Sequence, residues 1–150
     1  MRRLVLTAAV KPTMWGEERW EISARPDAPS RIADGPLAGR LLGDAFAGFP
    51  LLFKTIEARS RLSVQVHPNE TTCRVTGGEP KSEMWCALAD STVYAGLKPG
   101  TSAADLEGAV RAGAVEDLLA RRELKAGEAI YIPGGLVHAI GEGALLYEVQ

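Results

Sequence analysis

Short runs of β-type sequence, each stopped by a proline or glycine turn, dominate the chain from residue 51 onward. The run 51–57 is apolar enough for a buried strand, and 62–67 alternates apolar and polar residues until Pro68-Asn69 ends it. Further strands are predicted on the same grounds over 83–89, 92–97, 129–132, 137–140 and 144–149. The last two are expected to form a hairpin around Gly141–Gly143. This pattern predicts a mainly β domain.

Two other regions lack the β pattern. Residues 1–50 are rich in Gly, Pro, Ala and Arg, which predicts an irregular layer with short strands near 4–7 and 20–24 and a loop over 25–39. Residues 102–122 carry apolar side chains at helical spacing, and Ser102 can cap a helix there. A glycine at position 113 is expected to split this region into two short helices, whose leucines should pack against the sheet.

Length and composition narrow the class of protein. A chain of 150 residues is long enough for one domain with a real core. Its net charge of −2 gives no basic footprint for nucleic acid and no polybasic membrane signal, and no segment has the apolar length of a membrane span. The two cysteines, Cys73 and Cys86, are too few for a disulfide scaffold and indicate reduced thiols in a cytoplasmic protein.

Histidine is scarce, and both copies lie close to proline and glycine turns. His67 follows Gln65 by two residues, and residues i and i+2 of a strand point to the same face, so both side chains can reach one point. Val64 and Val66 are expected to face the other way, as a core layer. Two polar side chains on one face of such a strand require a metal or a polar pocket.

His138 and Glu83 could complete such a site, because each lies next to a Gly/Pro turn. Two imidazoles with carboxylate and carboxamide oxygens suit a divalent ion with open positions, such as zinc, manganese or iron(II). The absence of cysteine from the set argues against a closed structural zinc site. Each residue alone also has a plain interpretation: a single histidine is commonly a hydrogen-bonded core or surface residue, and a strand-edge glutamate is commonly solvated.

Taken jointly, the motifs resemble a known family. Gly127-x5-Pro133-x-Gly135 followed by His138 is similar to the second cupin motif, with Glu142 where asparagine is usual. Gln65-Val66-His67-Pro68-Asn69 stands where many cupins have His-x-His. This form, together with Lys81-Ser82-Glu83-Met84-Trp85, resembles the type I phosphomannose isomerase family. Matching segments at 15–16, 20–23, 35–39 and 50–54 extend the resemblance over nearly the whole chain. It implies one cupin jelly-roll domain, a β-barrel or sandwich, over residues 1–150 with a short helical insertion around 102–122.

The resemblance also implies a metal site. The family's ligands fall on Gln65, His67, Glu83 and His138, for one zinc ion or another divalent metal. Glutamine is a rare metal ligand, so its assignment here depends on the resemblance. Lys81 matches an active-site lysine of the family.

The activity implied is that of a metal-dependent aldose–ketose isomerase. Family members interconvert mannose 6-phosphate and fructose 6-phosphate by moving a proton between C1 and C2 through a cis-enediol. The metal would act as a Lewis acid, and Lys81 or a metal-bound hydroxide would carry the proton. Lys54 matches a recurrent family lysine whose role is less defined. The expected partner is a small hexose 6-phosphate, and the sequence leaves the oligomeric state open.

One departure from the family keeps other interpretations open. A family arginine, in a T-Y-R-like stretch downstream of the last metal histidine, is absent because the chain stops at Gln150. We expect the chain to be truncated, or its last apolar strand to pair with another chain. A cupin that binds metal and sugar phosphate without turnover, such as a sensor or degenerate paralogue, is the alternative function. A different cupin enzyme is disfavoured by the Q-V-H-P-N motif.

Overall fold

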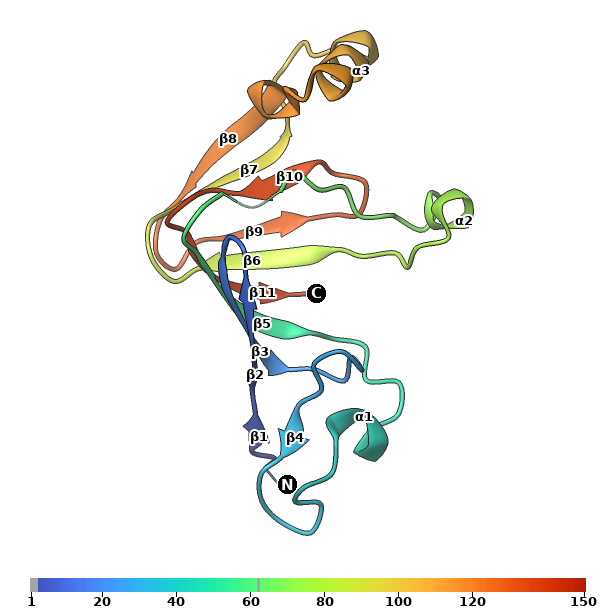
Figure 1. Ribbon diagram of the computed structural model, residues 1–150, viewed down its shortest axis with the longest axis vertical. Coiled ribbons are helices and arrows are strands. Elements are labelled where there is room, and N and C mark those ends of the chain that lie inside the picture. Colours follow the sequence, from blue (N-terminus) through green and yellow to red (C-terminus); the bar gives the residue numbers. More distant parts are fainter. Residues whose placement is uncertain (1–2, 62) are drawn as a thin grey trace.

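The computed structural model describes residues 3–61 and 63–150 and is mainly β, as predicted (Figure 1). Its larger layer is a six-stranded antiparallel sheet with the spatial order β2 (Ala9–Thr13), β3 (Gly16–Ile22), β5 (Phe53–Ala58), β11 (Leu145–Val149), β6 (Glu83–Ala87) and β9 (Ala129–Ile132). The second layer is a three-stranded antiparallel sheet with the order β10 (His138–Ile140), β7 (Ser91–Leu97) and β8 (Leu119–Leu124). Two short strands, β1 (Leu6–Thr7) and β4 (Arg31–Ile32), pair with each other.

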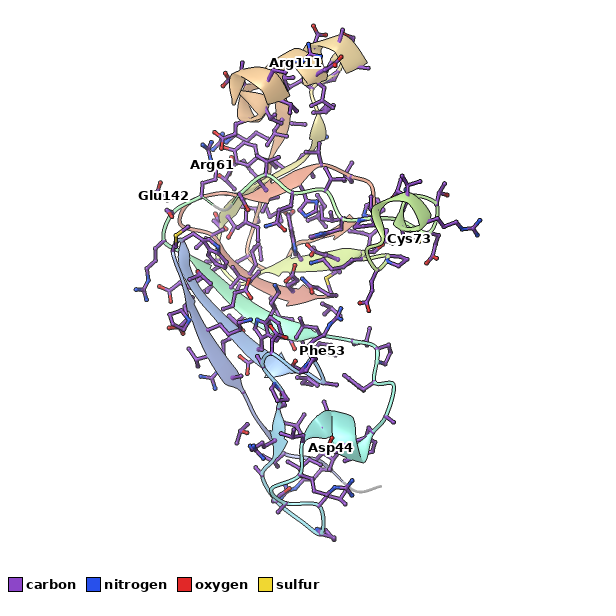
Figure 2. The ribbon with its side chains drawn as sticks, turned by 45° about the vertical axis from the view of Figure 1, so that its right-hand side comes forward. Asp44, Phe53, Arg61, Cys73, Arg111 and Glu142 are labelled. Atoms are coloured by element: carbon purple, nitrogen blue, oxygen red, sulfur yellow. The ribbon has the colours of Figure 1, made fainter. Side chains whose placement is uncertain are left out.

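The helices are short and lie outside these layers. They are α1 (Leu42–Ala45), α2 (Cys73–Thr76), α3 (Ala103–Ala112) and a 3-10 turn over Val115–Leu118. Figure 2 shows α3, marked by Arg111, at one end of the molecule and α1, marked by Asp44, at the other. Within the described residues, no helix has both the length and the apolar character needed to cross a bilayer.

Period-two alternation places the core between the two sheets. In β6, for example, Glu83, Trp85 and Ala87 are buried, whereas the residues between them are partly exposed. The main apolar cluster joins Ile56 and Leu146 of the larger sheet to side chains of the smaller one such as Val93. Side chains that point inward from the larger sheet therefore face either this core or the polar site described below.

The segment predicted as a strand over 62–67 is not a regular strand. Leu62 lies outside the described residues, and Gln65 forms only an isolated antiparallel bridge with His138. Val66 is 59% exposed, so the predicted core layer of Val64 and Val66 is wrong. The physical reason is that, in the described part of this segment, only Gln65 forms a bridge to β10, and His67 O instead accepts from Gly135 N in the turn before β10, so no continuous ladder forms.

The predicted hairpin of 137–140 and 144–149 is also wrong. β10 pairs with β7, whereas β11 lies between β5 and β6 in the other sheet. The turn crosses between layers because Gly141 N–H donates to Thr92 O, on β7, while Gly143 N–H donates to Ala58 O, on β5. Since β11 is paired on both sides within this chain, the expectation that it needs another chain for pairing is wrong as well.

The helical insertion is shorter than predicted and packs differently. The helix α3 ends at Ala112 because Gly113 takes a left-handed conformation (φ 68°), and β8 begins at Leu119. No residue of α3 is buried, so Leu106 is not the core residue expected, whereas Leu119, the first residue of β8, is buried as expected. Strand β2, which was not predicted, carries Lys11-Pro12 and tolerates the proline because it is an edge strand.

Candidate metal centre

His138 opens β10, and its ring is held in one orientation. The side chain is 4% exposed, and its Nδ1–H donates to Leu136 O at 2.8 Å. A carbonyl oxygen only accepts, so Nδ1 carries a proton, and in the neutral ring the lone pair that can bind an electrophile is therefore on Nε2. The ring also stands edge-on to Trp85, with centroids 5.5 Å apart and planes at 73°.

The Gln65 bridge brings the first motif beside the second. The backbones of Gln65 and His138 exchange two N–H···O bonds of 2.9 Å, and side chains of such a directly opposed pair lie on the same face. Two residues later, His67 O accepts from Gly135 N at 2.8 Å. The imidazoles of His67 and His138 therefore lie close, with centroids 4.9 Å apart. The predicted convergence occurs, although a loop rather than a strand produces it.

A close backbone approach fixes these loops against each other. A Cβ atom added to Gly134 would lie 2.5 Å from Pro68 O and 3.1 Å from Lys81 O. The segments that carry His67 and Glu83 can therefore approach the turn before His138 only because residue 134 is glycine.

Glu83 supplies a buried carboxylate from the first residue of β6. Its Oε1 lies 3.0 Å from Nε2 of His67 and 3.0 Å from Nζ of Lys81, and its Oε2 lies 3.8 Å from Nε2 of His138. Burial alone would raise the pKa of this carboxyl. Lys81 and the two imidazoles outweigh burial, so the pKa lies below its ordinary value and Glu83 is an anion.

The Nε2 atom of His67 has no hydrogen-bond partner among the described residues. This nitrogen is buried, and its 3.0 Å contact with Glu83 does not have acceptable hydrogen-bond geometry. Burial lowers the pKa of His67, and the Lys81 ammonium adds to this effect, so the imidazole is neutral at pH 7. A neutral ring with a buried, unsatisfied nitrogen is what a metal ligand requires.

Ligating atoms of His67, Glu83 and His138 lie within 4.8 Å of one another, close enough to bind one ion. A cavity of about 60 Å³ adjoins them, and its lining includes Gln65, Lys81, Glu83 and His138. The structure thus brings all five predicted site residues into one region. A larger groove of about 600 Å³ beside α1 is lined by residues such as Arg25 and Phe49 and by none of the five.

Sequence reasoning missed a buried ion pair behind this centre. Lys54, 7% exposed, lies 2.7 Å from Glu148 and 3.2 Å from Glu18. With Glu83 and Lys81, the cluster holds three carboxylates and two ammonium groups, leaving one negative charge for a cation to balance. One available signal was period two in β11, which places Glu148 on the same inward face as Leu146.

The imidazole pair and the carboxylate grouped here match the motif-based expectation. The model of the catalytic domain of type I phosphomannose isomerases matches residues 11–100. The chain belongs to the type I phosphomannose isomerase family. Among curated relatives, it is 33% identical over 149 residues to the mannose-6-phosphate isomerase of Streptococcus mutans and 38% identical over 119 residues to the isomerase ManA of Bacillus subtilis.

Solved structures of this family share the fold. The Bacillus subtilis mannose 6-phosphate isomerase matches 98% of this chain and 57% of its own, with a TM-score of 0.85 and 29% identity. The Salmonella typhimurium enzyme, solved with fructose 6-phosphate and zinc, matches 98% of this chain and 67% of its own, with a TM-score of 0.70 and 17% identity, a likeness in fold alone. The predicted cupin jelly roll is confirmed.

The curated comparisons cover most of this chain but only part of each relative. The matches to the Streptococcus mutans and Bacillus subtilis proteins cover 89% and 76% of this chain. They span 47% and 36% of those relatives, so the chain amounts to about half their length or less.

Proposed function

We propose that this chain is a cupin-type catalytic domain over residues 1–150 that binds one divalent metal, zinc, and interconverts mannose 6-phosphate and fructose 6-phosphate. The ligands would be Gln65, His67, Glu83 and His138. The observation that carries the proposal is the buried Nε2 of His67, which has no hydrogen bond from any described residue, while Glu83 and Nε2 of His138 lie beside it. Family membership and the zinc of the Salmonella typhimurium enzyme support the same metal.

The chemistry of the donor set fits this ion. Two neutral imidazole nitrogens and one carboxylate oxygen are typical of zinc sites that retain open positions for water or substrate. Gln65 has its side-chain nitrogen 3.2 Å from Ser63 Oγ, which leaves its amide oxygen available as the fourth donor. The single unbalanced negative charge of the cluster favours a cation in the same place.

Bound there, a divalent metal supplies Lewis acidity to the sugar oxygens next to the reacting carbons. The chain's own contribution to the proton transfer is Lys81, whose Nζ lies 3.0 Å from the ligand Glu83 and whose side chain is 27% exposed. A divalent cation bound beside Lys81 would favour loss of the ammonium proton to solvent, and the resulting amine would take the proton from C2 of the aldose, giving the cis-enediol, and return it to C1. Because Lys81 is partly exposed, a hexose 6-phosphate could reach it from solvent. The two free cysteines are compatible with work in the cytoplasm.

A coupled assay with fructose 6-phosphate and zinc tests the proposal. The purified chain should isomerise the sugar, and Lys81→Met should lose about 10²- to 10⁴-fold in kcat while retaining bound zinc. Lys98→Met is the matched control, because Lys98 bonds to Asp117 O far from the centre, and it should retain full activity. Zinc binding without turnover by the parent chain would overturn the isomerase assignment and favour a non-catalytic sugar-phosphate-binding cupin.

A further inference from the structure

Trp85 contacts two of the metal-site residues at once. Its indole Nε1–H donates to Glu83 Oε2 at 3.1 Å and to Glu148 Oε1 at 2.9 Å. Its ring stands edge-on to His138, and the side chain is 1% exposed. Trp85 and Glu83 lie two residues apart on β6, so both point into the same interior.

The two oxygens of Glu83 have different neighbours. Oε1 lies 3.0 Å from Nε2 of His67 and is also contacted by Lys81 Nζ and Gln150 Nε2, each at 3.0 Å, whereas Oε2 receives the indole N–H. A donor on one oxygen fixes the rotation of the carboxylate and so determines where the other oxygen points. The indole is itself anchored, because its second acceptor, Glu148, is held by Lys54 at 2.7 Å and by Gln150 at 3.1 Å.

We propose that Trp85 is a positioning residue for the metal, whose N–H turns Oε1 of Glu83 toward the ion while its ring supports His138. This inference depends on the metal binding proposed above. Outer-shell donors of this kind commonly change metal affinity by about 10- to 100-fold when they are removed.

The chain contains a matched control for this role. The pattern Glu-x-Trp occurs twice, as Glu18-Arg19-Trp20 and as Glu83-Met84-Trp85. In the first copy, Trp20 Nε1–H donates to Glu18 Oε2 at 2.6 Å and is 8% exposed, but its ring lies against the ammonium groups of Lys11 and Lys54. The two tryptophans thus make the same local bond, and of the two only Trp85 makes it to one of the three grouped ligand residues, Glu83.

The test compares the zinc dissociation constants of the parent, Trp85→Phe and Trp20→Phe by competition with a chelating dye. Phenylalanine keeps an aromatic ring and removes the N–H. Trp85→Phe should bind zinc about 10- to 100-fold more weakly and alter the visible spectrum of the cobalt-substituted protein, whereas Trp20→Phe should stay within about threefold of the parent. Equal affinity and an unchanged cobalt spectrum for Trp85→Phe would overturn the role. A parent chain that binds no zinc would instead overturn the proposed function.

A measurement on the unaltered chain covers the case in which Trp85→Phe does not fold. The three tryptophans give three indole N–H signals in a nitrogen-15 correlation spectrum. Zinc addition should move the Trp85 signal most and slow its hydrogen exchange, because the carboxylate it bonds is then fixed. An unmoved Trp85 signal in a zinc-bound chain would contradict the inference.

Discussion

The interior between the two sheets has a polar end and an apolar end, and the same strands contribute side chains to both. β5, β6 and β11 each carry charge or a hydrogen-bonding group at one end of their inward face and only apolar side chains at the other. From the polar to the apolar end the inward residues are Lys54, Ile56 and Ala58; Glu83, Trp85 and Ala87; and Glu148 and Leu146, followed by Ala144 just before β11. The polar end lies toward α2 and the C-terminus, at the right in Figure 1.

This difference shows that the two ends serve different purposes. Burying apolar side chains stabilises the fold, whereas burying charges requires close partners and often contributes little net stability. The carboxylates and ammonium groups at the polar end are each paired. Pairing limits the free-energy cost of burying them but does not make that end a net source of stability. We interpret the apolar end as the scaffold and the polar end as the functional site.

The largest expected effect on stability comes from breaking a pair at the polar end. Lys54→Met leaves Glu148 buried without its cation and should lower the free energy of unfolding by about 3–5 kcal/mol. Urea unfolding measures this, with Lys11→Met as the control because it breaks only the exposed pair with Asp27, worth less than about 1 kcal/mol. Similar small losses for both variants would show that leaving Glu148 without its cation does not carry the cost expected of a buried charge.

A substitution at the apolar end should lower the stability of the chain without changing its zinc affinity. Leu146→Ala removes a side chain with 0% exposure from the core and should cost about 2–5 kcal/mol. Zinc affinity of the folded variant should match that of the parent. Leu145→Ala, on the partly exposed opposite face of the same strand, should cost less. If Leu146→Ala weakened zinc binding as strongly as a change at the polar end, the separation of the two ends would be wrong.

A smaller, pH-dependent effect should come from the polar end. The pKa values of His67 and Glu83 both lie below their ordinary values, so the folded metal-free chain binds fewer protons than the unfolded chain. Stability should therefore fall as the pH drops below about 6.5, the unfolded value of histidine, and fall further below about 4.3, that of glutamate. Urea midpoints between about pH 7.5 and pH 4 measure this. His67→Gln should flatten the first part of the decline, and an unchanged profile would contradict the assignment.

Much of the fold was predictable because it depends on local pattern. Period-two runs and their Gly/Pro ends located β5, β6, β7 and β9, and the motif spacing identified His67, Glu83 and His138. The alternation fixes which face of a strand is buried, but not the sheet in which the strand pairs. For that reason the sequence suggested a hairpin where β10 and β11 join different sheets.

The polar network behind the centre was harder to foresee. Glu148 lies opposite Lys54 and Trp85 through the register of three strands, and these residues are far apart in the chain. Such register is a long-range property that no local window contains. The Val66 error has a related cause: the alternation of 62–67 indicated a strand, but only Gln65 of the described part of this segment has a bridge partner.

The metal content of the purified chain tests the central claim most directly. Elemental analysis after dialysis against zinc should find one zinc per chain in the parent and in Glu57→Gln, a control on the exposed outer face of β5. Glu83→Gln, His67→Ala and His138→Ala should each lose that zinc while remaining folded. If His67→Ala and His138→Ala retained as much zinc as the parent, the metal centre would not be where the structure indicates.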